Sequence, residues 1–228
     1  MENRKIGYEQ EYHKRKHNYL LNDNEYYEIR ARGALKDYFE ETILYNFNSS
    51  KFPRILDFGC GLGQNIYSLK DSSVGYDISE FAKDFCKKKR ISVVNELGSL
   101  RDSFFDIVFS AEVLEHLENP LDALKQMNQK LKKEGYLILV LPIDKWNKPN
   151  LKDENQHLYN WNFNTITNLL VRAGFKPIDY KILRRTGFYK LLPFSRISFS
   201  LYLFLTKLAA IISGSRHMRI ISIKNGRI

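Results

Sequence analysis

Three glycines at alternate positions follow a strongly apolar stretch near residue 60. Residues 55–65 read Ile-Leu-Asp-Phe-Gly-Cys-Gly-Leu-Gly-Gln-Asn, which predicts a buried strand that turns into a helix. Glycines at such a turn let the backbone approach a ligand, and amides at a helix N-terminus can bind it. A dinucleotide fingerprint would need glycine where this chain has Gln64, and no Gly-Lys-Ser/Thr follows. The turn therefore disfavours a pyrophosphate-bearing ligand.

Two carboxylates accompany this turn. Asp57 lies inside it, and Asp77 ends the next predicted strand, Gly75-Tyr76-Asp77, twenty residues later. A carboxylate at the tip of the adjacent strand accepts two hydroxyl hydrogen bonds, which specifies a ribose diol. Asp57 is a poor neighbour for a pyrophosphate but a good one for a cation. The ligand that combines a ribose with positive charge is S-adenosylmethionine, which we predict as the cofactor.

Strand and helix patterns alternate around these residues. This alternation predicts an α/β fold, in which a parallel sheet carries helices on its faces. Strands are expected at 54–58, 74–77, 91–95, 105–110, 136–141, 176–183 and 217–224. Helices are expected after Gly63 and at 79–89, 120–133 and 164–173. Asn119 is the expected N-cap of the 120–133 helix and Gly135 its expected stop. Residues 8–45 are expected to form tyrosine-rich helices that pack over the sheet.

Five longer stretches occur in a fixed order within residues 50–180. They are ILDFGCGLGQN (55–65), VGYDIS (74–79), FFDIVFSAEVLEHLENP (104–120), LKKEGYLILVLP (131–142) and HLYNWNFNTITNLLVRAGF (157–175). In these stretches the sequence resembles the class I S-adenosylmethionine-dependent methyltransferases, specifically the small-molecule group that includes the ubiquinone-type O-methyltransferases. The resemblance implies a Rossmann-like fold with a seven-stranded, mostly parallel sheet, an antiparallel last strand and helices on both faces.

The resemblance also implies which residues hold the methionine part of the cofactor. The backbone of Gly59, Cys60, Gly61 and Gly63 would line it, and Asp57 would anchor the turn and the cofactor's amino group.

The remaining cofactor contacts follow from the same resemblance. Asp77 would hold the ribose hydroxyls, and Ile78 would pack on the adenine. Ser110 would offer its carbonyl near the methionine end, and Arg30 or Arg32 would meet the methionine carboxylate.

Each of these assignments has a purely structural alternative. The glycine turn would then be a tight turn without a ligand. Asp77 would cap the following helix, unless Ser79 does so instead. Cys60 would be a small loop filler, because no basic partner is adjacent to activate its thiol.

Few residues are candidates for the chemical step. Methyl transfer from a sulfonium is an in-line displacement with an excellent leaving group, so positioning dominates, and a base is needed only if the acceptor must lose a proton. His157 follows the fifth strand's loop, where the acceptor pocket of this group forms, and it titrates in the useful range. We therefore take His157 as the candidate catalytic residue, with a structural role favoured for His116. Asp144, Tyr159 and Trp161 are alternative pocket-lining residues.

The sequence also narrows the acceptor classes. Enzymes that methylate adenine or glutamine nitrogens place an Asn/Asp-Pro-Pro-aromatic motif where this chain has residues 110–113, Ser-Ala-Glu-Val. We assemble no cluster of acidic and amide ligands for a divalent cation, so no metal is expected. A metal-independent O- or N-methyltransferase remains. The leading hypothesis is methyl transfer to a hydroxyl of a small, sugar-like or lipid-linked acceptor.

The net charge of +10 belongs to one end of the chain. Residues 1–180 carry 26 basic and 26 acidic residues, whereas residues 181–228 carry ten basic residues and no acidic one. The same end contains the apolar run 191–214. Taken as one helix, Arg196, Ser200 and Lys207 form a narrow polar stripe on it.

An apolar helix bordered only by cations is typical of an element that faces anionic lipid. The sequence thus favours membrane contact through residues 188–213. Two alternatives stay open: this segment could be a lid packed against the N-terminal helices, or it could form a homodimer interface. A second class of function is an RNA-directed methyltransferase or a noncatalytic cofactor-binding module that uses this basic segment. Nucleic-acid surfaces interleave basic residues with exposed aromatics, whereas this segment interleaves them with Leu and Ile, which disfavours nucleic acid.

Composition fits a compact globular chain with two cysteines and no disulfide framework. The N-terminus is too polar for a signal peptide, so we expect a cytoplasmic protein, peripheral on the inner face of the membrane if the membrane hypothesis holds. The expected organisation is an N-terminal helical cap at 1–48 and a methyltransferase domain at 49–228, with an apolar basic insertion at 185–215.

Overall fold

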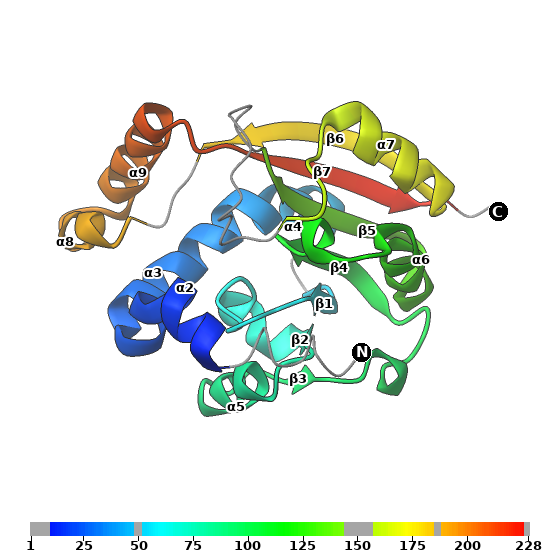
Figure 1. The fold of residues 1–228 in the computed structure, drawn as a ribbon, viewed down its shortest axis with the longest axis horizontal. Coiled ribbons are helices and arrows are strands. Elements are labelled where there is room, and N and C mark those ends of the chain that lie inside the picture. Colours follow the sequence, from blue (N-terminus) through cyan, green and yellow to red (C-terminus); the bar gives the residue numbers. More distant parts are fainter. Residues whose placement is uncertain (1–9, 48–51, 144–156, 185–187, 226–228) are drawn as a thin grey trace. The chain divides into compact units, whose positions relative to one another are not determined.

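The fold is given by a computed structural model that describes residues 10–47, 52–143, 157–184 and 188–225 (Figure 1). The chain forms two compact units. The first contains residues 1–101 and 187–205, and the second contains residues 102–186 and 206–228.

The first unit combines a short parallel sheet with the N-terminal helices. Its strands are β1 (Ile55–Phe58), β2 (Ser73–Tyr76) and β3 (Val93–Val94), and β2 pairs in parallel with both others. Its helices are α2 (Gln10–Asn22), α3 (Asn24–Ala34), α4 (Glu40–Asn46), α5 (Glu80–Lys88) and α8 (Leu192–Ser195), with a π-helix η2 (Leu35–Phe39) and 3-10 helices η3 (Tyr67–Ser72), η4 (Leu97–Ser99) and η6 (Tyr189–Leu191). Helix α9 (Phe199–Ser213) begins in this unit and ends in the second.

The second unit is built on four longer strands. They are β4 (Phe105–Ala111), β5 (Leu131–Pro142), β6 (Phe175–Leu183) and β7 (His217–Lys224). Strands β4 and β5 are parallel, and β7 runs antiparallel to both β5 and β6. The 3-10 helix η5 (Leu114–His116) follows β4, and helices α6 (Pro120–Lys130) and α7 (Phe163–Arg172) pack against β5 and β6 respectively.

The seven strands have the order β3-β2-β1-β4-β5-β7-β6. In the first unit β1, β2 and β3 run parallel, and in the second unit β7, the last strand in the chain, runs antiparallel to its neighbours. This is the predicted Rossmann-like arrangement with an antiparallel last strand. The observed strand positions agree with the prediction to within a few residues, although β3 is shorter than expected.

Short polar side chains begin the principal helices. Asn119 caps α6 as predicted, because its side-chain oxygen accepts a hydrogen bond from the Asp122 amide, and Pro120 follows it. Asn162 caps α7 through the Thr165 amide in the same way. Local sequence signals therefore set the start of both helices.

The helix expected directly after Gly63 does not form. Residues 64–66 make turns and are followed by η3, which leads into β2 at Ser73. Only nine residues separate Gly63 from Ser73, and the first three of them are used by turns before η3 begins.

Gly135 is also not the end of a helix, as the sequence had suggested. Helix α6 ends at Lys130, and the buried Leu131 already pairs with Phe105 in the sheet. The register between β4 and β5 then shifts, and a Cβ added at Gly135 would meet the Leu131 side chain at 2.9 Å and the Lys132 carbonyl at 3.0 Å. Glycine is thus required at position 135, because the irregularity in β5 brings Leu131 and Lys132 too close for a side chain there.

The apolar segment 188–213 forms two helices instead of one. Helix α8 ends at Ser195 and α9 begins at Phe199, so Arg196 lies between them and does not share a helical stripe with Lys207. In the first unit, Leu192, Tyr202 and Leu203 are buried in a cluster with residues of α2 and α3, and Figure 1 shows α8 and the start of α9 beside these helices. Among the described residues, no helix combines the length and apolar character needed to cross a bilayer.

Candidate active site

The glycine turn after β1 depends on left-handed backbone conformations. The φ angles are 78° at Gly59, 50° at Gly61 and 74° at Gly63, where a side chain would be strained. A Cβ added at Gly63 would also approach the Ile91 Cδ1 atom to 2.6 Å. The backbone conformation therefore favours glycine at all three positions, and the packing also requires it at Gly63.

Hydrogen bonds fasten this turn to the end of β2. The carbonyl of Tyr76 accepts from the amides of Gly59 (2.8 Å) and Cys60 (3.0 Å), and the Gly63 amide donates to the Cys60 carbonyl at 2.9 Å. The two strand tips consequently form one rigid edge, at which Asp57 and Asp77 are placed.

Asp57 is a buried carboxylate, with 1% of its surface exposed. Neither of its side-chain oxygens has a hydrogen-bond partner among the residues described. Burial raises the pKa of Asp57 well above its ordinary value, and the nearby charge of Asp77 raises it further. A cationic ligand placed here would relieve both unfavourable effects.

Asp77 has two backbone partners. Its Oδ2 atom accepts from the Gly61 amide at 2.7 Å, and its Oδ1 atom accepts from the Ser79 amide at 3.0 Å. The cap of α5 is the Ser79 hydroxyl, which accepts from the Ala82 amide, so Asp77 is not the helix cap. Each carboxylate oxygen has a second lone pair, which leaves acceptor capacity for ribose hydroxyls. Ile78 beside it is 37% exposed and offers an apolar surface.

The two cysteines are buried behind the turn. Cys60 and Cys86 are free thiols, and the Cys86 thiol donates to the Gly61 carbonyl at 3.5 Å. The hydrogen bond with Cys86, together with burial, raises the pKa of Cys60 well above its usual range. A thiol held protonated in this way is not a nucleophile, which favours the interpretation of Cys60 as a loop filler.

The N-terminal helices contact the glycine turn, which the sequence analysis missed. The Tyr27 hydroxyl donates to the Leu62 carbonyl at 2.8 Å. His13 is buried and stacks on Phe81, and its Cε1 atom lies 4.0 Å from the position of a Cβ added at Gly61. The tyrosine-rich helical pattern was the only signal in the sequence for these contacts.

The arginines considered for the methionine carboxylate lie in the same helix. The guanidinium of Arg32 sits over the Phe199 ring, 4.2 Å from its centroid, and Arg30 is half-buried. The role of either arginine toward the cofactor stays a prediction.

The second unit carries the other predicted site residues. Ser110 is buried in β4, one residue before the strand ends, opposite Leu139 of β5. Tyr159 stacks on the buried Trp161, with 5.2 Å between ring centroids, while Asp144 lies outside the described residues.

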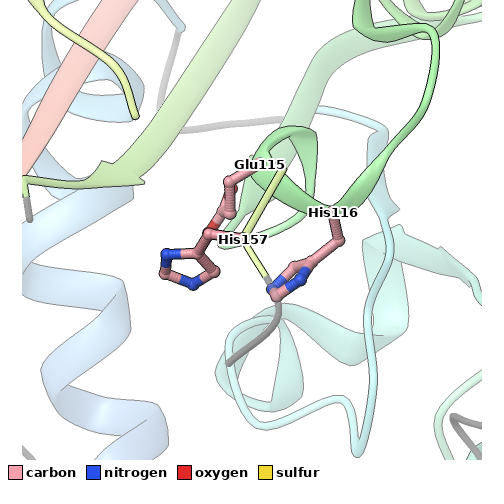
Figure 2. Close-up of side chains that lie close together, drawn as sticks. All are labelled: Glu115, His116 and His157. Atoms are coloured by element: carbon pink, nitrogen blue, oxygen red, sulfur yellow. The ribbon is translucent and has the colours of Figure 1, made fainter. Parts of the chain in front are cut away.

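His157 lies beside Glu115 and His116 of the η5 turn. One potential ligand atom from each of the three side chains lies within 4.8 Å of the others (Figure 2). The two imidazole rings meet edge to face with 4.9 Å between centroids. The Leu158 amide donates to the Glu115 carbonyl at 2.7 Å, which fixes the two segments together. The structure thus joins the predicted catalytic residue to the histidine for which a structural role was favoured.

Comparison with known proteins agrees with this arrangement. A family described as "Methyltransferase domain" matches residues 26–180, which is more than half of the chain. The chain belongs to this family of methyltransferase domains, and its fold is that of the class I S-adenosylmethionine-dependent members.

Curated relatives are similar over part of their length. One is the mitochondrial ubiquinone biosynthesis O-methyltransferase of Schizosaccharomyces pombe, 34% identical over 100 residues that cover 38% of this chain and 36% of the relative. Another is the tRNA U34 carboxymethyltransferase of Helicobacter pylori (strain Shi470), 31% identical over 101 residues that cover 37% of this chain and 39% of the relative. The chain therefore aligns with less than half the length of either relative.

Solved structures share the fold. A SAM-dependent methyltransferase of Thermotoga maritima superposes with a TM-score of 0.58 at 17% identity, covering 91% of this chain and 92% of the other. S-Adenosylmethionine is the cofactor of this class. The left-handed glycine turn fits its positively charged methionine part, as does the buried Asp57 carboxylate, which has no hydrogen-bond partner among the residues that the structure describes.

Proposed function

We propose that this chain transfers the methyl group of S-adenosylmethionine to a hydroxyl of a small, sugar-like or lipid-linked acceptor. The main support for S-adenosylmethionine as the cofactor is the burial of Asp57. Its carboxylate has no hydrogen-bond partner in the described part of the chain. A buried charge without a partner is costly, so its placement in β1, directly before the glycine turn, favours a site for a cationic ligand. Asp77, at the neighbouring strand tip, would accept the ribose hydroxyls.

His157 is the residue that we propose to prepare the acceptor hydroxyl. It is half-buried, so that its ring is held beside Glu115 and His116 and still reaches solvent. The similarity to a relative named as an O-methyltransferase of ubiquinone biosynthesis, 34% identical over 100 residues, supports a hydroxyl acceptor. An acceptor hydroxyl must lose its proton during attack, and a positioned imidazole performs that step well near neutral pH.

Peripheral contact with a membrane is the second part of the proposal. The side of α9 that is buried carries Tyr202, Leu203, Thr206 and Ala210. Its exposed apolar side chains, together with those of the α8 region, are Phe194, Ile197, Phe204, Leu208, Ile211 and Ile212. An apolar helix face of this kind beside exposed Lys190 and Lys207 suits insertion into an anionic lipid interface, and the buried face allows the lid role as well.

The basic charge of the C-terminal segment is partly committed to internal contacts. Arg196 pairs with Glu25 at 2.7 Å, and the buried Arg219 pairs with Asp179 at 2.9 Å. The Lys224 ammonium donates to the carbonyls of Asn128 and Leu131. These contacts reduce the charge available to an anionic partner, so the apolar face contributes more to the membrane proposal than the net charge does.

An RNA acceptor is the alternative, and the similarity to a tRNA carboxymethyltransferase is the observation that favours it. The exposed surface of α9 argues against it, because its large side chains are aliphatic with a single phenylalanine and not an interleaved set of aromatics and cations. A noncatalytic module that binds the cofactor alone would share the first unit's features and lack transfer.

The experiment that tests the proposal is a transfer assay with methyl-labelled S-adenosylmethionine. The purified chain is incubated with hydroxyl-bearing quinone precursors, glycans and polyprenyl-linked sugars, and in parallel with bulk tRNA. We expect label in a hydroxyl-bearing small molecule or lipid. Label in tRNA alone would support the alternative, and cofactor binding without transfer to any acceptor would support a noncatalytic module.

A further inference from the structure

A run of four basic residues ends helix α5 in the first unit. Residues 87–90 read Lys-Lys-Lys-Arg, and the equal numbers of basic and acidic residues in 1–180 conceal this local excess of positive charge. Glu80 of the same helix pairs with Lys83 at 3.5 Å, which leaves Asp84 as the other acid of α5 against the four cations. The end of α5 is therefore strongly positive.

The third residue of this run holds the end of α5 in place. The Lys89 ammonium donates to the Asn24 side chain and lies over the Tyr27 ring, 4.5 Å from its centroid. Asp23, the N-cap of α3 beside Asn24, accepts a hydrogen bond from the Tyr189 hydroxyl at 2.9 Å. The end of α5, the start of α3 and the 3-10 helix η6 therefore meet at one corner of the first unit.

Four cations at this corner are exposed to solvent. The basic corner, as we call this set, consists of Lys87, Lys88, Arg90 and Lys190. Within the described ranges, none of the four side chains takes part in a hydrogen bond or an ion pair. Glu25, an acid of the same α3 start, is already paired with Arg196 at 2.7 Å. The positive charge of the basic corner is thus available to an external anion.

An apolar surface follows directly along the chain from the basic corner. The helix η6 leads into α8 and then α9, whose exposed large apolar side chains in the first unit are Phe194, Ile197 and Phe204. Binding to a lipid interface strengthens with the apolar area inserted and with the electrostatic attraction to anionic lipids. The basic corner and the neighbouring α8–α9 segment supply one of these contributions each.

We infer that the basic corner is a second contact surface for an anionic bilayer, beside the exposed face of α8 and α9. The inference deepens the proposed function and rests on its membrane part. Internal pairing of Arg196 and Arg219 removes positive charge from the C-terminal segment, and the basic corner provides charge for lipid phosphates from another part of the chain.

Nucleic acid is the other polyanion that exposed cations could bind. Single-stranded nucleic acid is bound by cations together with aromatic rings on which the bases stack. Near the basic corner, the rings of Tyr19 and Tyr189 stack on each other with 4.0 Å between centroids, and Tyr27 is buried. The exposed apolar side chains of α8 and α9 suit a bilayer and not a phosphate backbone, so the observations favour lipid.

Flotation with phosphatidylglycerol vesicles, compared with phosphatidylcholine vesicles, tests this contact without any activity measurement. The test variant combines Lys87→Gln, Lys88→Gln and Arg90→Gln. It should bind phosphatidylglycerol vesicles at least tenfold more weakly than the wild type, because each basic residue near an anionic surface contributes about fivefold to binding. Wild-type binding should also weaken at high salt and be weak with phosphatidylcholine.

The matched control removes the same charge from the second unit. It combines Lys125→Gln, Lys133→Gln and Arg172→Gln, which are exposed there, and it should float as the wild type does. The test variant keeps Lys89, the residue of the run that contacts the protein, so we expect it to fold. If it does not, Lys190→Gln alone decides, because it should weaken vesicle binding several-fold.

The outcomes separate this surface from the proposed methyl transfer. Wild-type vesicle binding in the test variant, an equal loss in the control, or no binding of phosphatidylglycerol vesicles by the wild type overturns the inference. Binding of bulk tRNA that only the test variant loses, without vesicle binding by the wild type, would overturn it in favour of nucleic acid. Vesicle binding through the basic corner without methyl transfer to any acceptor would refute the proposed transfer and leave the surface standing.

Discussion

The Tyr27 hydroxyl donates a 2.8 Å hydrogen bond to the carbonyl of Leu62, between the second and third glycines of the turn after β1. This bond ties helix α3 directly to the predicted cofactor turn. Burial raises the pKa of Tyr27, so its hydroxyl remains a donor at any physiological pH. The Lys89 ammonium lies over the same ring, 4.5 Å from its centroid. The N-terminal helices are therefore part of the cofactor site's support.

The first prediction concerns this hydrogen bond. Tyr27→Phe should lower the free energy of unfolding by about 1 kcal/mol and weaken S-adenosylmethionine binding several-fold, because the Leu62 carbonyl loses its donor and the turn loosens. Tyr26→Phe is the matched control, since it removes a hydroxyl from the adjacent buried tyrosine of α3, whose ring faces Tyr19 and Tyr189. Chemical denaturation and cofactor titration measure the two effects. Equal cofactor affinity in both variants would remove the proposed support role.

The pH dependence of stability follows from Asp57. Its pKa is raised in the folded chain, so the native state binds more protons than the unfolded state above the ordinary value of 3.8. Stability contributed by the protonated form is present at low pH and is lost as pH rises through the folded pKa. The difference in unfolding free energy between wild type and Asp57→Asn should therefore shift in favour of the variant as pH rises. Urea unfolding of both proteins, without cofactor, across pH 4 to 8 measures this; a pH-independent difference would contradict it.

The predicted binding of the ribose by Asp77 can be tested separately from its hydrogen bonds within the turn. Asp77→Ala should weaken the binding of S-adenosylhomocysteine by tenfold or more, but loss of the Gly61 and Ser79 contacts alone would also weaken it. A ribose-deoxygenated analogue of S-adenosylhomocysteine distinguishes the two effects. The wild-type chain should discriminate against the analogue, and Asp77→Ala should not. Unchanged discrimination in the variant would show that Asp77 only fastens the turn.

Membrane contact depends on the exposed face of α9. Phe204 and Ile212 are 62% and 80% exposed, and a fully inserted large apolar side chain contributes about 1.5–3 kcal/mol. Phe204→Ser with Ile212→Ser should thus reduce flotation with phosphatidylglycerol vesicles at least tenfold. Val171→Ser, which alters an exposed apolar residue of α7, is the control and should float as wild type does. Deleting 188–213 is less informative, because Tyr202 and Leu203 belong to the buried cluster.

Flotation results also separate the alternatives left open for this segment. A wild-type chain that does not float with anionic vesicles would argue against membrane contact. If the same chain is dimeric in solution and the double variant is monomeric, the face is a subunit interface. A monomer that does not float would leave the lid role, which the buried side of α9 already allows.

Features with a local cause could be predicted from the sequence. The alternate glycines anticipated the left-handed turn, and Asn119 with Pro120 marked the start of α6. Strand β7 was recognised from its apolar run, and its antiparallel pairing with β5 and β6 follows the family fold.

Features that depend on long-range packing could not be predicted from the sequence. The break at Arg196 was not predicted, since an apolar run gives no sign of where tertiary contacts interrupt it; Arg196 pairs there with Glu25 of α3. Leu131 enters the sheet immediately after α6 because it pairs with Phe105, which a Gly135 stop signal does not reveal. The proximity of His157 to Glu115 required the Leu158 contact, which joins two distant stretches.

The most direct test of the account is calorimetric titration of the full chain with S-adenosylmethionine, compared with Asp57→Asn. We predict saturable binding at one site in the wild type, and at least tenfold weaker binding in the variant because the cationic part of the cofactor loses its buried carboxylate. The ligand-free variant should remain folded, since Asn fills the same space without a charge. Absence of binding in the wild type, or equal affinity in a folded Asp57→Asn variant, would contradict it.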